Sequence, residues 1–123
     1  MKRLILAGVA GLILTGAGAA AQAADRSPDQ CLRPQYLRNH TIGDDHTLYF
    51  DYNGTSVFEV TTNKNCAAAV TSSDPIVLKD STQGMMCKPI DWDLSVRGSH
   101  CIVTGVRKLS PAEVAALPKG KRP

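Results

Sequence analysis

Asp44-Asp45-His46 is the densest cluster of side chains that could bind a metal ion. Carboxylates and imidazoles are ordinary ligands of divalent cations, so these three residues are candidates for a metal site. Aspartate is also favoured in turns, because its side chain accepts hydrogen bonds from nearby backbone N–H groups. Turn formation is the favoured interpretation of this cluster, and the sequence leads us to expect no cofactor.

The other histidines and the methionine pair add little to a metal hypothesis. His40 and His100 are not spaced for joint ligation with a third histidine on one helix or strand, and we expect both at ordinary solvent positions. Met85-Met86 precedes a cysteine, and soft sulfur ligands of this kind suit copper(I). Paired methionines more often fill gaps in a core, which is the interpretation we favour.

The residues that could catalyse a reaction form no recognisable set. The chain has no G-x-S-x-G motif, which would place a nucleophilic serine on a sharp turn. Asp91 and Asp93 are two residues apart, but on the exposed face of a strand such carboxylates usually maintain solubility. We therefore expect a protein that is not an enzyme.

Residues 1–23 have the pattern of a secretory signal peptide. A basic start, Met1-Lys2-Arg3, is followed by an apolar run over residues 4–14 and by the cleavage motif Ala21-Gln22-Ala23. The apolar run is shorter than the roughly 20 residues that cross a bilayer. We predict a mature chain that starts near Ala24, is periplasmic or secreted, and is not inserted in a membrane after cleavage.

The charge of the chain argues against a nucleic-acid partner. Loss of Lys2 and Arg3 with the signal peptide lowers the formal net charge from +3 to +1, because all acidic residues lie in the mature part. Three of the remaining positive charges belong to residues 118–123, which we expect to form a disordered basic tail. A nearly neutral body lacks the basic face that binds nucleic acid.

Cys31, Cys66, Cys87 and Cys101 follow the predicted cleavage site. An even number of cysteines in a small exported domain is typical of a disulfide framework, and no C-x-x-C pair suggests a metal site. Four cysteines allow three pairings, which the sequence does not separate. Our prediction is Cys31 with Cys66 and Cys87 with Cys101, so that each bridge closes a loop within its own half of the chain.

Alternating apolar residues predict a β-hairpin over residues 45–61. A two-residue loop at Asn53-Gly54 would place a glutamate on the apolar face. A three-residue loop over residues 52–54, with Gly54 left-handed in a bulge, pairs Leu48 with Phe58 and keeps the apolar side chains on one face. We therefore favour the three-residue loop.

Further elements are predicted from shorter patterns. Strands are expected at residues 39–42, 76–78 (an edge or connecting strand), 90–96 and 101–108. A capping box over residues 110–113 begins a short helix. The predicted fold is mostly β: a small antiparallel β-barrel or compact sandwich of five to six short strands, braced by disulfides, with a short C-terminal helix. It forms a single domain over residues 24–117.

Five motifs follow one another along the mature chain. They are Asp44-Asp45-His46-Thr47-Leu48 before a strand, Phe58-Glu59-Val60 leading to Cys66, Met86-Cys87, Cys101-Ile102-Val103, and Leu109-Ser110-Pro111-Ala112-Glu113. This order resembles a family of small exported four-cysteine bacterial proteins, found chiefly in proteobacteria and catalogued as a domain of unknown function. Lys88-Pro89-Ile90-Asp91 departs from the family, whose members often have a Gly-Asp turn there. The resemblance implies bacterial export and a disulfide-bonded β fold, and it assigns no activity.

Two functions are compatible with these features. The first is a small exported, non-catalytic binding or interaction module that contacts another exported or envelope protein through its loops or an edge strand. Exposed apolar residues gathered on one loop or edge would support it. The alternative is a periplasmic metal- or small-ligand-binding protein, which would require Asp44, Asp45 and a histidine to converge.

Overall fold

The computed structural model describes residues 31–63, 65–79 and 84–123. The predicted signal peptide and residues 24–30 lie outside the described residues. In chain order the elements are the 3-10 turn η1 (Pro34–Tyr36), β1 (Leu37–Asp44), β2 (Thr47–Tyr52), β3 (Ser56–Thr62), β4 (Ile76–Lys79), the 3-10 turn η2 (Pro89–Asp91), β5 (Asp93–Val96), β6 (Ser99–Lys108), α1 (Pro111–Ala116) and the 3-10 turn η3 (Lys119–Lys121).

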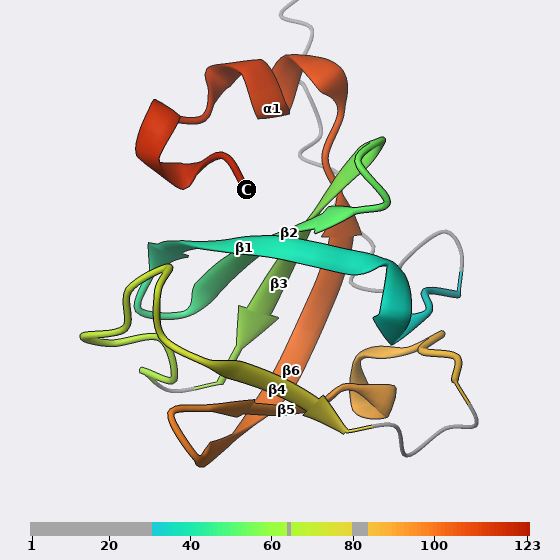
Figure 1. The fold of residues 1–123 in the computed structure, drawn as a ribbon, viewed down its shortest axis with the longest axis vertical. Helices are drawn as coiled ribbons and strands as arrows, with labels where there is room; N and C mark the ends of the chain where they lie inside the picture. The colour runs from blue at the N-terminus through green and yellow to red at the C-terminus, as the bar shows by residue number, and fades with distance from the viewer. Residues whose placement is uncertain (1–30, 64, 80–83) are drawn as a thin grey trace, which may run out of the picture.

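The six strands form one antiparallel sheet in the order β1-β2-β3-β6-β5-β4. The ten-residue strand β6 joins its two halves, because its first part pairs with β5 and its second part with β3. The sheet curls around its apolar face into a half-barrel, with β1 and β4 as its edges (Figure 1). This confirms the prediction of a mostly β fold with a short C-terminal helix.

The core lies on the concave face of this sheet and follows the period-two patterns of the sequence. Its buried apolar side chains include Leu48, Phe50, Phe58, Val60, Trp92, Leu94, Val96, Cys101, Val103 and Val106. Each fully buried large side chain stabilises the fold by roughly 1.5–3 kcal/mol. The predicted sharing of one face by the apolar residues of β2 and β3 is confirmed.

The loop between β2 and β3 consists of residues 53–55, because Tyr52 pairs with Ser56. Asn53 and Gly54 have positive φ angles of 57° and 73°, the combination that a type I′ turn requires. The left-handed conformation predicted for Gly54 is therefore confirmed. The predicted three-residue loop over residues 52–54 is displaced by one position.

The register of this hairpin differs from the predicted one. Leu48 pairs with Val60 and Phe50 with Phe58, so the predicted pairing of Leu48 with Phe58 is wrong. Side chains alternate between the two faces of a strand, so a shift by two residues returns each side chain to the same face. The hydrophobic pattern therefore placed the side chains correctly without determining the register.

The predicted strand over residues 90–96 begins only at Asp93. Residues 89–91 form η2 instead, and the Asp91 carboxylate accepts hydrogen bonds from the backbone N–H groups of Cys87 and Lys88, both at 2.8 Å. Ile90 is consequently 82% exposed instead of buried. The hydrogen bonds that the Asp91 carboxylate accepts stabilise this turn more than the alternation of apolar and polar residues favours a strand before Asp93.

The disulfides join Cys31 to Cys87 and Cys66 to Cys101, so the predicted pairing is wrong. Two hydrogen bonds between Leu32 and Met86, of 2.8 and 2.7 Å, bring the first pair together. The second pair meets because the chain after β3 runs past the beginning of β6, where Asn63 N–H donates to Ile102 at 2.9 Å. Both bridges depend on the order of strands in the sheet, whereas the prediction assumed local loops.

Two disulfides are typical of a protein from an oxidising environment. Among the described residues, no helix is long and apolar enough to cross a membrane. The longest α-helix described, α1, has six residues and begins at the capping box predicted for Ser110 and Glu113.

The basic tail is ordered, contrary to the expectation for residues 118–123. The Thr41 hydroxyl donates to the carbonyl of Lys121 at 2.6 Å, and the Lys121 ammonium group donates to the carbonyl of Gly43. The Arg122 guanidinium donates to the carbonyls of Ala115 and Leu117 at 2.7 and 2.9 Å. A cation at the carboxyl end of a helix is favourable, so these contacts hold the tail against α1 and β1.

Candidate functional site

Asp44, Asp45 and His46 form the exposed turn between β1 and β2. Asp44 Oδ1 accepts the backbone N–H of His46 at 2.8 Å, and this bond is the main cause that lowers the pKa of the Asp44 carboxyl group. In the described parts of the chain, no three His, Cys, Asp or Glu side chains are grouped as a metal site would require. The sequence-predicted metal candidates therefore serve the turn, and the structure gives no support to a metal site there.

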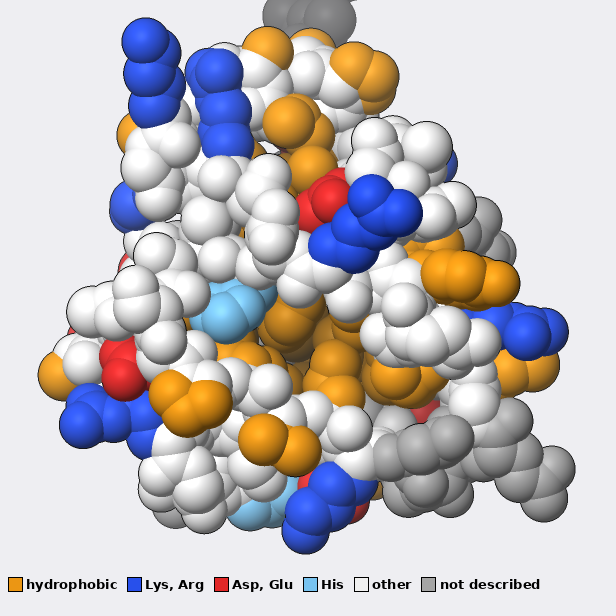
Figure 2. Space-filling view, in the orientation of Figure 1, with side chains coloured by type: hydrophobic (Ala, Val, Ile, Leu, Met, Phe, Trp, Pro, Cys, Tyr) orange, Lys and Arg blue, Asp and Glu red, His pale blue; other side chains and the backbone are white. Residues whose placement is uncertain are grey.

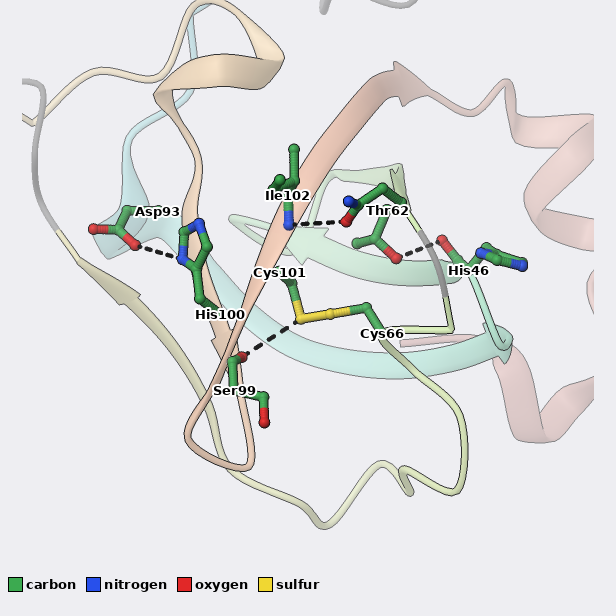
Figure 3. Close-up of a disulfide and its surroundings, with 9 residues drawn as sticks. His46, Thr62, Cys66, Asp93, Ser99, His100, Cys101 and Ile102 are labelled. Atoms are coloured by element: carbon green, nitrogen blue, oxygen red, sulfur yellow. Dashed lines mark hydrogen bonds and ion pairs between the residues drawn. A yellow bond between two sulfur atoms is a disulfide. The ribbon is translucent and has the colours of Figure 1, made fainter.

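His100 and Asp93 lie together on the convex face of the sheet. Their side chains are 3.3 Å apart on neighbouring strands, to one side of the Cys66–Cys101 disulfide in Figure 3. The His100 side chain is 63% exposed, so the pair is largely screened by water and contributes little to stability.

Three large apolar side chains are exposed near β4, β5 and β6: Val77, Ile90 and Ile102. Their exposed fractions are 51%, 82% and 52%. Ile90 and Ile102 border a hollow of about 380 Å³, which Trp92 and His100 also line. Ile90 and Ile102 lie together at this hollow, and we call them the outer-face patch. Apolar side chains that gather on a surface often mark an interaction site.

The third exposed apolar side chain, Val77, belongs to the edge strand β4. Its four residues pair with β5 in continuous register, from Ile76 opposite Val96 to Lys79 opposite Asp93, without a bulge. Ile76 and Leu78 point towards the core, whereas Val77 and Lys79 are exposed. The predicted edge strand at residues 76–78 is therefore confirmed.

The hydrogen bonds of β4 follow from the hairpin between β5 and β6. Arg97 and Gly98 have positive φ, as in a two-residue turn, so Val96 directs its backbone groups towards β6. Backbone groups alternate in direction along a strand, so those of Val77 and Lys79 face β5. The bond from Arg97 N–H to Pro75, at 3.3 Å, fits this alternation.

The N–H and C=O groups of Ile76 and Leu78 consequently point away from the sheet. In residues 31–63, 65–79 and 84–123, none of the described hydrogen bonds reaches them. An edge of this kind is a template on which another strand can pair.

The opposite edge, β1, is protected. Its pairing with β2 is irregular between Leu37 and His40 and again between Ile42 and Asp44. The C-terminal turn η3 also covers it through the contacts of Lys121. Bulges and covering segments are the usual means by which proteins block strand addition. Of the two edges, β4 is therefore the one that the described residues leave accessible to a partner.

Two nitrogen atoms on the concave side are buried without a hydrogen-bond partner: His40 Nε2 and Trp92 Nε1. Both rings neighbour Phe50, with centroids 6.1 and 5.9 Å from its centroid. A buried polar group without a partner costs about 1–3 kcal/mol, so such groups need an explanation. Figure 2 shows a hollow with an apolar floor between β1 and β4, bordered by a histidine side chain.

Sequence reasoning missed this aromatic group. His40 was expected in solvent, although it is two residues from Ile42, and period-two spacing places both side chains on one face of a regular strand. That spacing was the signal from which the inward position of His40 could have been predicted. Trp92 is buried in the core, but the sequence pattern carried no information about its N–H group.

Comparisons of this chain with protein-family models, with curated proteins and with solved structures found no match.

Proposed function

We propose that this protein is a small exported, non-catalytic module that binds an extended segment of another exported or envelope protein as an additional strand on β4. The observation that supports it most directly is the regular, accessible edge of β4, with the outward backbone groups of Ile76 and Leu78. Strand addition uses main-chain hydrogen bonds for affinity and alternate side chains for specificity.

The neighbourhood of β4 defines the chemistry of the partner segment. On the convex side, its side chains would lie beside the exposed Val77, so apolar residues fit there. On the concave side, they would lie over the apolar floor between β4 and β1 (Figure 2). The exposed Lys79 favours an acidic residue near that end of the strand. The partner is therefore an extended, largely apolar segment that carries an acidic residue.

Export of the protein is part of the proposal. It is supported by the signal-peptide pattern over residues 1–23 and by two disulfides, which persist in oxidising compartments. The resemblance to an exported bacterial four-cysteine family stays a prediction that agrees with it. Amino-terminal sequencing of protein from the periplasmic fraction should find a chain that starts near Ala24, and an intact Met1 would contradict export.

Strand addition can be tested with a phage-displayed library of linear hexapeptides selected on the oxidised mature protein. We expect enriched peptides with alternating apolar residues, and calorimetry on a synthetic copy gives their dissociation constant. Leu78→Pro removes the outward N–H without breaking a bond to β5, since that group faces away from the sheet. Leu78→Ala is the matched control, because it shortens the same side chain and keeps the N–H.

The lost bond, worth about 0.5–1.5 kcal/mol, and the clash of the proline ring should together weaken binding at least tenfold more in Leu78→Pro than in Leu78→Ala. Equal losses in the two variants would show that binding does not use the β4 backbone. A selection that yields no binding peptide would also contradict the proposal.

A further inference from the structure

The disulfides join the first cysteine to the third and the second to the fourth, so neither bridge links cysteines that are neighbours in the sequence. A signal peptide leads the chain through the membrane, so Cys31 and Cys66 reach the oxidising side before Cys87. The loop from Cys31 to Cys66 is also shorter than the native loop of sequence separation 56, and a shorter loop loses less entropy on closure. Oxidation of the unfolded chain therefore favours a bridge that the folded protein lacks.

The chain is unfolded when this oxidation begins. A domain of this size buries a small core, and small exported domains often fail to fold without their disulfides. The native partners also meet late. Cys101 lies in β6, the last strand, which must pair with β3 before Cys66 and Cys101 can meet. The sheet is therefore not in place to direct the first oxidation.

The folded protein holds its first and second cysteines at opposite ends of the three-stranded meander β1-β2-β3. Just after the first cysteine, the N–H of Arg33 donates to the hydroxyl of Tyr52, the last residue of β2, at 3.4 Å. Just after the second, the N–H of Ala67 donates to the carbonyl of Asp45, in the turn before β2, at 2.9 Å. Figure 1 shows the same separation, with the first described residues at the right of the view and the loop after β3 at the left.

A bridge between Cys31 and Cys66 is therefore incompatible with the folded sheet. A strand of eight residues, such as β1, spans roughly 25 Å. Bridged cysteines need Cα atoms within about 7 Å of each other. A chain with this bridge must break it before the meander can form, and the bond breaks when a thiolate attacks one of its sulfur atoms.

We infer that this protein is a substrate of a thiol–disulfide isomerase in its compartment, an enzyme with a nucleophilic cysteine thiolate. The inference rests on the proposed export of the chain and is separate from strand addition on β4. Folding ends the exchange, because Cys101 is then completely buried and its sulfur is out of reach of a thiolate.

The rearrangement needs no net oxidation or reduction. The isomerase thiolate attacks the sulfur of Cys31, the Cys31–Cys66 bond breaks, and Cys66 leaves as a thiolate. This thiolate attacks Cys101 in a Cys87–Cys101 bridge, which forms the native Cys66–Cys101 bond and releases the thiolate of Cys87. The Cys87 thiolate then attacks Cys31 in the mixed disulfide, which forms the second native bond and returns the isomerase thiolate.

Oxidative refolding of the mature chain tests the inference. Trypsin leaves each of the four cysteines on its own peptide, so mass spectrometry of non-reduced digests identifies every pairing. The reduced, denatured chain is diluted into native buffer with diamide, which oxidises thiols and leaves no thiol to catalyse exchange. We expect peptides joined through Cys31 and Cys66 to exceed those joined through Cys31 and Cys87 at least fivefold.

The second step adds the catalyst after the diamide has been removed. A catalytic amount of reduced protein disulfide isomerase should restore the native pairing at least tenfold faster than glutathione at the same thiol concentration. Direct formation of the native pairs during oxidation would overturn the inference, because no bridge would then need rearrangement. Equal rates with the isomerase and with glutathione would also overturn it, because a small thiol would then suffice.

Variants with two cysteines are the matched controls, and their pairing can be read whether or not they fold. One has Cys31→Ser with Cys87→Ser, and the other has Cys66→Ser with Cys101→Ser. Each can form one intramolecular bridge, so the isomerase should not change its yield. An increase as large as in the wild type would show a general effect on folding and would overturn the inference. Refolding starts from the mature chain, so its result does not depend on export, which amino-terminal sequencing tests separately.

Discussion

A variant with Cys66→Ala and Cys101→Ala should lose about 4–5 kcal/mol of unfolding free energy. The bridge closes a loop of sequence separation 35, for which chain entropy alone gives about 3.8 kcal/mol. Cys101 is also completely buried, so removal of its sulfur leaves a small cavity that costs about 1 kcal/mol more.

The matched variant has Cys31→Ala and Cys87→Ala. Its loop of sequence separation 56 predicts a slightly larger entropic loss, about 4.2 kcal/mol. Cys31 and Cys87 are only partly buried, so no comparable cavity follows. The free energy lost through the cavity at Cys101 should therefore offset the smaller entropic loss of the shorter loop. The variant that lacks the 66–101 bridge should then be at least as unstable as the other.

Urea denaturation followed by circular dichroism measures both losses, and non-reducing peptide mapping of the wild type checks the pairing. A small domain has about 5–15 kcal/mol in total, so either variant should have a much lower midpoint. A loss below about 1 kcal/mol in either variant would refute the reasoning. A peptide that contains Cys31 joined to Cys66 would refute the fold from which it starts.

Three further changes test individual features. Gly54→Val should destabilise the protein by about 1–3 kcal/mol, because a β-branched residue is strained at a φ of 73°, whereas Gly120→Val, at an ordinary φ, should have a small effect on the melting temperature. Ser110→Ala should cost about 0.5–2 kcal/mol in urea denaturation, because the hydroxyl accepts the N–H of Glu113 at 3.2 Å, and an unchanged midpoint would contradict the cap. Burial lowers the pKa of His40 in the folded state, so its contribution to stability is complete above the ordinary pKa near 6.5 and is lost as the pH falls below it. Urea midpoints between pH 8 and pH 5 should therefore fall less in His40→Gln than in the wild type, and equal slopes would contradict a buried neutral imidazole.

Local patterns predicted most of the elements and the faces of the strands. Alternation identified the core side chains of β2, β3 and β5, and the capping box located the start of α1. These features depend on residues within a few positions of one another. The pattern failed at Ile90, where Asp91 caps a turn, and there Pro89 and Asp91 were local signals of that turn.

Features that depend on distant contacts were not predictable in this way. The disulfide pairing follows from the position of β6 between β3 and β5, and the order of the tail follows from its contact with β1. The same is true of the candidate sites. The edge position of β4 was predicted, but its accessibility depends on what covers each edge of the sheet. The unpartnered nitrogens of His40 and Trp92 depend on which rings meet in the core.

The two disulfides overlap along the chain, since Cys66 lies between Cys31 and Cys87, and Cys87 lies between Cys66 and Cys101. A protease that cuts the backbone once, anywhere between Cys31 and Cys101, therefore leaves two fragments that stay covalently joined. With consecutive pairing, one cut between Cys66 and Cys87 would have separated the molecule into halves. A nicked chain of this kind keeps both halves of its sheet at high local concentration, so it can retain its fold after a single cleavage.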